Sequence, residues 1–182
     1  MNIGVTMRYD PDKHHRRSIR LRGYDYRRPG AYFVTICIHG RANLFGNVLA
    51  GEMRLNAAGL SIDSEWEALP QRFPALCLDV YTIMPNHFHA IITLGDAPAT
   101  SARLGDIVGA FKSLTTNAYG CGVRDHGWPP FDRRLWQRNY YEYIIRGEAD
   151  LARIRDYIRT NPARWDADQL HPAARPNRFN QE

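Results

Sequence analysis

Two histidines stand one residue apart in the apolar run MPNHFHAIITL, which covers residues 84–94. A run of this composition predicts a β-strand, and the side chains of a strand alternate between the two faces of its sheet. His87 and His89 should therefore point to one face, with Phe88 on the other. Two imidazoles side by side can bind one divalent metal ion, but histidines on a strand are also found as satisfied core or surface residues.

A second pair of reactive side chains lies in RIRDYIRTNP, residues 153–162. This stretch predicts the end of a helix, in which Tyr157 and Asn161 share one face because they are four residues apart. The Tyr157 hydroxyl could act as a nucleophile, and the Asn161 amide oxygen is a hard ligand suited to Mg²⁺ or Mn²⁺. The alternative is that the Tyr157 ring packs beside Ile154 and Ile158 on the apolar side of the helix.

The other apolar patterns predict the elements that must position these residues. Strands are expected over 31–40, 76–84, 87–95 and 134–147. Helices are expected within 56–74, within 96–120 and over 148–162, with a small hairpin at 43–56 and a loop at 120–130. The order β-α-β-β-α-β plus a last helix indicates an α+β fold. We expect a ferredoxin-like split βαβ sandwich, an antiparallel sheet with helices on one face, followed by the C-terminal helix that carries Tyr157.

The composition favours a polyanionic partner. The chain has 182 residues and a net charge of +5, and only Lys13 and Lys112 of its 24 basic residues are lysines, so 24 − 2 = 22 are arginines. Arginine suits bidentate contact with phosphate and stacking on bases. Residues 8–28 interleave arginines with tyrosines, which indicates either a nucleic-acid contact arm or a solvated arm.

Several other classes of protein are not indicated. No apolar run approaches the ~20 residues of a membrane span, and the N-terminus lacks the apolar core of a signal peptide. Cys37, Cys77 and Cys121 are far apart, so neither a disulfide framework nor a structural zinc site is expected. We therefore expect a cytoplasmic protein with no membrane partner.

The chain resembles the HUH-type single-tyrosine transposases, and among them the REP-associated tyrosine transposases, in three motifs in this order: YTIMPNHFHAIITL, LWQRNYYEYIIR and RIRDYIRTNP. The stretch RRSIRLRGYDYRRPGAYFVTICIHGRANLFGNV resembles the N-terminal part of the same subgroup. The resemblance covers about residues 16–165. It implies an HUH transposase-like catalytic domain at 29–162, between a basic N-terminal arm at 1–28 and a loose C-terminal tail at 163–182.

The resemblance implies a metal-dependent transposase or endonuclease that cleaves and rejoins single-stranded DNA, at hairpin-forming repeats. In this family a tyrosine attacks a phosphate, forms a 5′-phosphotyrosyl link and releases a 3′-OH. By motif, Tyr157 takes the role of the nucleophile, and His87 and His89 take the roles of ligands to Mg²⁺ or Mn²⁺. Asn161 falls where relatives place an amide side chain as the third ligand, although many of them have Gln there.

The strand before the last helix offers other candidates for these roles. Tyr140 and Tyr141 are alternative nucleophiles, and family members often carry a His at the position of Tyr143. Glu142 is either a group that assists the metal or a solvated strand residue.

Contact with single-stranded or hairpin DNA is expected from a set of basic residues: Arg16, Arg17, Arg20, Arg22, Lys112 and Arg138. Tyr24, Tyr26 or Trp136 could stack on unpaired bases, but Trp136 fits a core position equally well. Both a homodimer and a monomer are compatible with the sequence.

Two further functions are compatible with these residues. One is a domesticated relative that binds structured single-stranded DNA without cutting it. The other is a metal-dependent phosphoesterase in which water is the nucleophile. The presence of His87, His89 and Tyr157 together favours the transposase over the binder, because binding alone does not need all three.

Overall fold

A four-stranded sheet forms the centre of the computed structural model, which describes residues 21, 23–96 and 102–175. Its strands are β1 (Gly30–Cys37), β4 (Leu76–Ile83), β5 (His87–Leu94) and β6 (Tyr141–Ile144). They lie in the order β4-β5-β1-β6, and every neighbouring pair is antiparallel. The first and last of these strands in the chain are thus neighbours in space, as the split βαβ arrangement requires.

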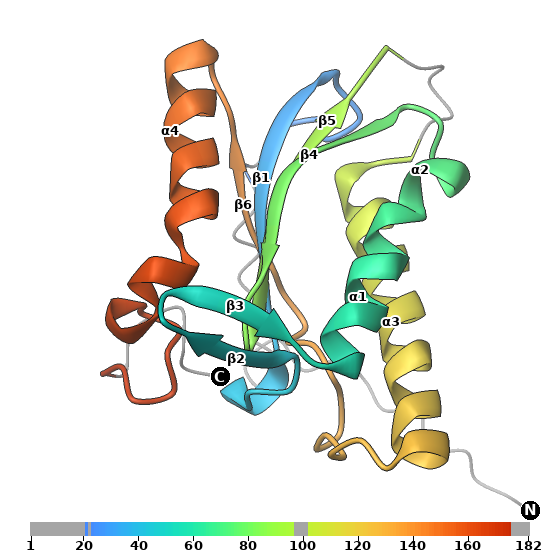
Figure 1. The fold of residues 1–182 in the computed structure, drawn as a ribbon. Helices are drawn as coiled ribbons and strands as arrows, with labels where there is room; N and C mark the ends of the chain where they lie inside the picture. Colours follow the sequence, from blue (N-terminus) through green and yellow to red (C-terminus); the bar gives the residue numbers. More distant parts are fainter. Residues whose placement is uncertain (1–20, 22, 97–101, 176–182) are drawn as a thin grey trace, which may run out of the picture.

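Two helices cover one face of this sheet and a third covers the other (Figure 1). α1 (Ala57–Glu67) and α3 (Leu104–His126) enclose the main core, and α4 (Glu148–Thr160) lies on the opposite face beside β4 and β5. The expected α+β fold is confirmed, with α4 as the separate C-terminal helix.

Aromatic rings fill the main core between the sheet and its two helices. Trp66 of α1 lies 4.7 Å from Phe88 of β5 and 5.1 Å from Phe111 of α3, measured between ring centroids. Pairs at these distances and near-perpendicular angles stabilise a core beyond the area that they bury. This packing places Phe88 on the sheet face that α1 and α3 cover. His87 and His89, its neighbours on β5, must therefore face α4.

Shorter elements complete the fold. They are η1 (His39–Arg41), β2 (Gly46–Leu49), β3 (Glu52–Leu55), α2 (Leu69–Arg72) and η2 (Pro162–Ala167). β2 and β3 form the expected hairpin, in which Ala50 and Gly51 take φ values of 52° and 77°. Positive φ at both central residues is what a two-residue turn of the hairpin type needs.

Two predicted elements differ from the structure. The strand expected over 134–147 is limited to β6, because Leu135 and Trp136 are buried in the main core and only Trp136 forms a bridge, to Ile38. The loop expected at 120–130 begins later, because α3 continues to His126 and ends at Gly127 in the left-handed conformation. Glycine is the residue that most readily ends a helix in this way.

The expected loose tail at 163–182 is wrong for its first part. Residues 162–167 form η2, and Trp165 and Leu170 are buried. Burial of these two apolar side chains compensates the entropy lost when the segment is ordered. Residues 176–182 lie outside the described part of the chain.

None of the helices among the described residues combines the length and the apolar character needed to cross a membrane.

Candidate functional site

The two histidines of β5 lie on the sheet face that α4 covers. In the register of β1 and β5, His87 is opposite Cys37 and His89 is opposite Thr35. Both imidazoles are buried, with 0% and 2% of their surface exposed, and their ring centroids are 4.6 Å apart. The prediction that they share one face is confirmed.

Each histidine is held through its Nδ1 atom. His87 Nδ1–H donates to Asn86 Oδ1 at 2.8 Å, and His89 Nδ1 is hydrogen-bonded to Thr35 Oγ1, also at 2.8 Å. When one ring nitrogen of a neutral histidine carries the proton, the other carries the lone pair. Both Nε2 atoms lie on the α4 side, and that of His87, whose Nδ1 carries the proton, presents its lone pair there.

Burial keeps the two imidazoles neutral. It lowers the pKa of His87 to about 4, and the carboxylate of Asp168 offsets only part of this effect. Burial, together with the neighbouring His87, also places the pKa of His89 well below its ordinary value. Neutral imidazole is the form that binds a metal ion.

Tyr157 reaches the same space from α4. Its hydroxyl lies 3.3 Å from His89 Nε2, and its ring packs edge-on against Phe33, with centroids 5.9 Å apart. The buried side chains of Ile154 and Ile158 join Phe33 in a small core beneath α4. Tyr157 thus packs beside apolar residues and keeps 37% of its surface exposed.

The phenol of Tyr157 is protonated at neutral pH. Partial burial, followed by the negative charge of Asp168, raises the pKa of Tyr157 to about 12. Any reaction that uses the Tyr157 oxygen as a nucleophile must therefore remove a proton from it.

Asn161 lies at the C-terminal end of α4, one turn after Tyr157, and is buried. Its Nδ2 donates to Asp168 Oδ2 at 3.2 Å, which directs its Oδ1 away from that carboxylate. Within the described residues, Asn161 Oδ1 and His87 Nε2 are both buried without a hydrogen-bond partner. Two such atoms in one place are unusual, because buried polar atoms normally have partners.

Asp168 is the residue of this site that the sequence did not reveal. Its Oδ2 lies 3.9 Å from His87 Nε2, and its Oδ1 accepts a hydrogen bond from Leu170 N at 2.6 Å. It lies in the polar segment that the sequence predicts to be a loose tail. The only sequence feature that indicates its position is the pair of apolar residues around it, Trp165 and Leu170, whose burial brings the segment next to the histidines.

The donors around this space fit a divalent cation. His87, His89 and Asp168 each offer one atom, and the three atoms lie within 4.8 Å of one another. The Asn161 amide oxygen adds a hard donor in the same place. Imidazole nitrogens with carboxylate and amide oxygens suit Mn²⁺ and related ions, and the two orphaned buried atoms are what a bound cation would satisfy.

The residues of β6 divide between the two faces of the sheet. Tyr141 is opposite Thr35 and Tyr143 is opposite Phe33, so both lie on the face of the site. Glu142 points to the other face and does not approach the histidines.

Tyr140 precedes β6 and packs against the main core, with its ring centroid 5.5 Å from Lys112 Nζ. Of the alternative tyrosines, Tyr141 is therefore the better placed.

Only two of the predicted DNA-contact residues fall in the described part of the chain. Arg16, Arg17, Arg20 and Arg22 lie outside it. Lys112 and Arg138 line one groove of about 330 Å³ together with Arg134, on the α3 side of the sheet and not on the face of the histidines. Lys112 Nζ donates to the carbonyl oxygens of residues 137, 138 and 139 at 2.9, 3.3 and 3.0 Å, so its ammonium group also holds this loop in place.

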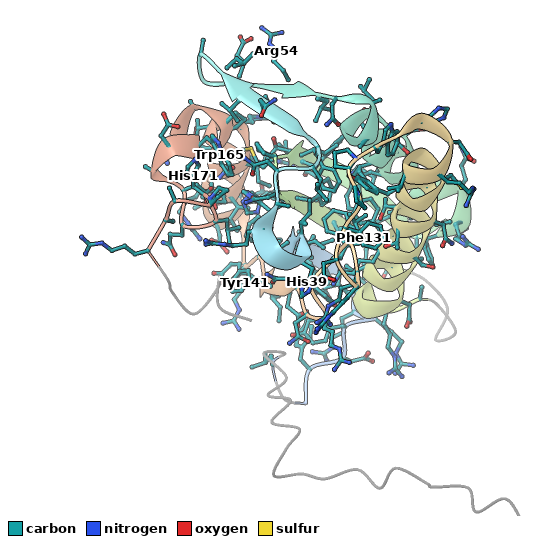
Figure 2. All side chains as sticks on the ribbon, turned by 90° about the horizontal axis from the view of Figure 1, so that it is seen from below. His39, Arg54, Phe131, Tyr141, Trp165 and His171 are labelled. Carbon is teal, nitrogen blue, oxygen red and sulfur yellow. The ribbon has the colours of Figure 1, made fainter. Side chains whose placement is uncertain are left out.

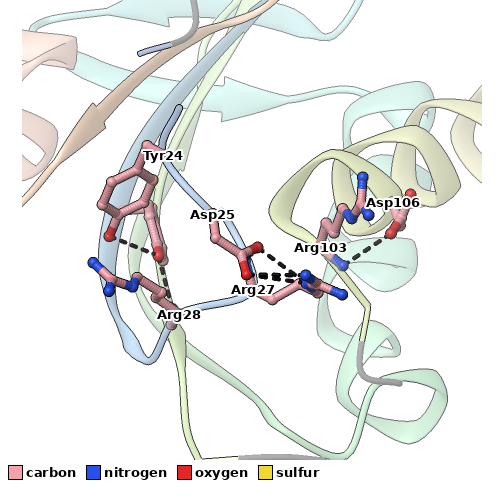
Figure 3. A network of polar contacts seen from close by, with 7 residues as sticks. Tyr24, Asp25, Arg27, Arg28, Arg103 and Asp106 are labelled. Carbon is pink, nitrogen blue, oxygen red and sulfur yellow. Dashed lines mark hydrogen bonds and ion pairs between the residues drawn. The ribbon is translucent and has the colours of Figure 1, made fainter. Parts of the chain in front are cut away.

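The candidate stacking residues are largely integrated into the fold. Trp136 is a core residue whose Nε1 donates to Thr115 Oγ1 at 2.9 Å. Tyr24 and Tyr26 are half-buried against the main core and line a hollow of about 360 Å³ at the start of α3, together with Arg103. Figure 3 shows Asp25 and Arg27 between Tyr24 and Arg103. Of these three rings, the two tyrosines keep an exposed side.

Comparison with known proteins gives two relatives in sequence and several related structures. No family model matches the chain. An uncharacterized protein of Haemophilus influenzae is 38% identical over 185 residues, which cover 92% of this chain and 99% of that protein. A second protein of the same organism, named as a candidate REP-associated tyrosine transposase, is 26% identical over 143 residues, 77% of this chain and 74% of that protein.

One of the related structures is that of a REP-associated tyrosine transposase bound to a REP hairpin. It superimposes with a TM-score of 0.58 at 18% identity and covers 91% of this chain and 94% of that chain. This superposition shows a common fold. The 38% identity over nearly the full length of both chains shows that this chain belongs to one family with that Haemophilus influenzae protein. In sequence and fold the chain is similar to the REP-associated tyrosine transposases, the family that its motifs resemble.

Proposed function

We propose that this protein is a divalent-metal-dependent transposase or endonuclease that cleaves and rejoins single-stranded DNA through a covalent link to Tyr157. One observation carries the proposal. The Tyr157 hydroxyl lies 3.3 Å from His89 Nε2, beside a buried set of donors that fits a cation. The similarity to REP-associated tyrosine transposases supports it, and the neighbour bound to a REP hairpin supports hairpin or single-stranded DNA as the partner.

The reaction is an exchange of esters at phosphorus. The Tyr157 oxygen attacks the phosphate and loses its proton, an O–P bond forms, and the bond from phosphorus to the 3′ oxygen breaks. The 3′ oxygen leaves and takes up a proton, and the 5′ phosphate stays on Tyr157. Because one ester replaces another, attack of a 3′-OH on the phosphotyrosine rejoins strands without ATP.

The residues of the site have separate tasks in this proposal. His87, His89, Asn161 and Asp168 would hold Mg²⁺ or Mn²⁺, with neutral imidazoles at physiological pH. When bound, the cation would supply positive charge that stabilises the phosphate in the transition state and offsets the effect of Asp168 on the phenol. α4 would hold the Tyr157 oxygen beside the phosphate.

A denaturing gel tests this proposal. Hairpin oligonucleotides with randomised single-stranded flanks are labelled at the 3′ or at the 5′ end and mixed with protein and Mn²⁺. We expect the 3′ label to stay with the protein through denaturation and the 5′ label to leave on a free fragment. Tyr157→Phe should bind the same DNA on a native gel and give no covalent band, whereas Tyr141→Phe should behave as the wild type.

Other outcomes would indicate a different function. Retarded DNA without a covalent band in the wild type would indicate a non-catalytic DNA-binding protein. Cleavage that persists in Tyr157→Phe without a covalent band would indicate a phosphoesterase that uses water.

A further inference from the structure

Asn86 is a buried amide between the histidine pair and the C-terminal segment. Only 2% of its surface is exposed, and it precedes β5 in the turn that follows β4. Its side chain takes part in three hydrogen bonds, each to a different part of the chain. Asn86 has no direct part in the reaction described above, because its side chain does not face the donor atoms of the proposed metal site.

The hydrogen bonds of Asn86 leave one orientation for its amide. Its Nδ2 donates to Leu170 O at 2.8 Å and to Arg41 O at 3.2 Å. A carbonyl oxygen can only accept, so the nitrogen of the amide must lie on that side. The amide oxygen must therefore face His87 Nδ1, 2.8 Å away.

This orientation determines the tautomer of His87. An amide oxygen can only accept, so His87 Nδ1 must carry the proton and Nε2 must carry the lone pair. The same argument does not hold for His89, because its partner Thr35 has a hydroxyl that can donate or accept. Without Asn86, the acceptors next to the His87 ring would lie on its Nε2 side, where Asp168 Oδ2 is 3.9 Å away and the Asn161 side chain is also near.

We propose that Asn86 is a positioning residue that fixes the Nδ1–H tautomer of His87 and thereby keeps Nε2 free to bind the metal ion. In its absence the ring takes the opposite tautomer, in which Nε2–H donates to Asp168 or Asn161 and the lone pair points away from the site. The importance of this residue for metal binding rests on the proposed function, but the tautomer itself does not.

The same amide joins the tautomer to the C-terminal segment. Leu170 O accepts from Asn86, and Leu170 N donates to Asp168 Oδ1 at 2.6 Å. One residue of the segment thus contacts both the group that sets the tautomer and the carboxylate that faces the other side of His87. The position of residues 168–170 and the tautomer of His87 therefore depend on the same hydrogen bonds.

Nitrogen-15 NMR of the histidine rings tests the proposal in metal-free protein at neutral pH. Protonated and unprotonated ring nitrogens have well-separated shifts, and the His87→Gln variant assigns the signals. We expect Nδ1–H on His87 in the wild type and Nε2–H in Asn86→Ala. Titration with Mn²⁺ alone should show affinity about 10- to 100-fold weaker in Asn86→Ala.

Two further variants separate positioning from packing. Asn56→Ala removes an exposed amide at the start of α1, which donates to Leu44 O and accepts from Gly59 N away from the site, and should leave both the tautomer and the affinity unchanged. Asn86→Asp keeps an acceptor for His87 Nδ1–H and should retain the tautomer. If Asn86→Ala does not fold, Asn86→Leu, which is close to Asn in shape, replaces it.

The proposal is overturned if wild-type His87 carries its proton on Nε2, or if the Nδ1–H tautomer persists after Asn86 is replaced by Ala or Leu. Failure of the wild type to bind Mn²⁺ would contradict the proposed function, whereas the tautomer would still decide the role of Asn86.

Discussion

At the scale of single residues, two side chains of the site are hydrogen-bonded at one polar atom and leave their second polar atom buried without a partner. His87 Nε2 and Asn161 Oδ1 are buried, and the described residues offer them no hydrogen bond. Leaving such atoms unsatisfied costs about 1–3 kcal/mol each. In the proposed function, a bound cation would satisfy both atoms and offset this cost.

Asp168 should contribute strongly to the binding of that cation. Asp168→Asn removes the negative charge next to His87 Nε2, and we expect Mn²⁺ affinity to fall by about 10-fold or more. Isothermal titration measures it. Asp166→Asn, an exposed change two residues away, is the matched control and should bind as the wild type does. Equal affinities in the two variants would remove Asp168 from the metal site.

The residues of the site differ in how far the sequence predicts them. His87 with His89, and Tyr157 with Asn161, are pairs whose common face follows from the period of a strand or a helix. Asp168 has no such period, because its place depends on long-range contacts of Trp165 and Leu170.

At the scale of elements, α4 is held against the sheet by a small core and one ion pair. Arg155 donates to Asp79 Oδ1 and Oδ2 at 3.0 and 2.6 Å, in the part of β4 where the register with β5 is interrupted. Since α4 also carries Tyr157, these contacts set the distance between the phenol and the histidines.

The ion pair makes the docking of α4 sensitive to acid. Hydrogen bonds from Arg155 lower the pKa of the Asp79 carboxyl, although burial opposes them. A lowered pKa stabilises the fold above the unfolded value of about 4, and this contribution is lost as the pH falls through the folded pKa. Wild type should exceed Asp79→Asn in free energy of unfolding at neutral pH, and the difference should shrink as the pH falls below about 4.

Urea denaturation across this pH range measures the difference. Asp96→Asn, at an exposed position, is the control and should follow the wild type throughout. A gap between wild type and Asp79→Asn that does not change with pH would contradict the account.

The long α3 helix depends on a glycine near its end. A Cβ at Gly122 would overlap the ring of Trp128, which folds back onto the helix. We expect Gly122→Ala to destabilise the protein by about 1–3 kcal/mol. Gly120→Ala, where the Cβ meets open space, should stabilise it by about 0.5–1 kcal/mol. Thermal unfolding of both variants checks the prediction, and equal effects would contradict it.

The elements show where local patterns suffice. Strands and helices with a clear period, such as β5 and α4, lie within a residue or two of their expected bounds. The stretch before β6 contains Leu135, Trp136 and Tyr140, but Leu135 and Trp136 are buried in the main core instead of forming a strand. Its conformation is therefore set by tertiary packing, which propensity does not encode.

At the scale of the whole molecule, residues that are distant in the sequence meet at the site, where Trp165 and Asp168 lie next to His87. The last described residues cross the histidine face, next to β3, and the rings of Trp165 and His171 lie 4.7 Å apart in this segment (Figure 2). His87, from the middle of the chain, is thereby covered by residues that follow α4.

Loss of the Trp165 ring should release this cover. Because Trp165 is buried, Trp165→Ala should cost about 3 kcal/mol, and most of this cost should appear as local opening of residues 162–175. Limited trypsinolysis after Arg164 should accelerate, and Mn²⁺ affinity should fall. Leu49→Ala, at an exposed position of the hairpin, should change neither. Faster cleavage with unchanged Mn²⁺ affinity would show that the segment is not part of the metal site.

In the proposed reaction, Tyr157 is the residue that becomes linked to DNA. The most direct measurement is to trim the DNA from the covalent complex with nuclease, digest the protein with trypsin and weigh the nucleotide-bearing peptide. We predict the added mass on residues 156–159, the peptide DYIR. Added mass on residues 139–146, which contain Tyr140, Tyr141 and Tyr143, or DNA cleavage without any peptide adduct, would contradict the account.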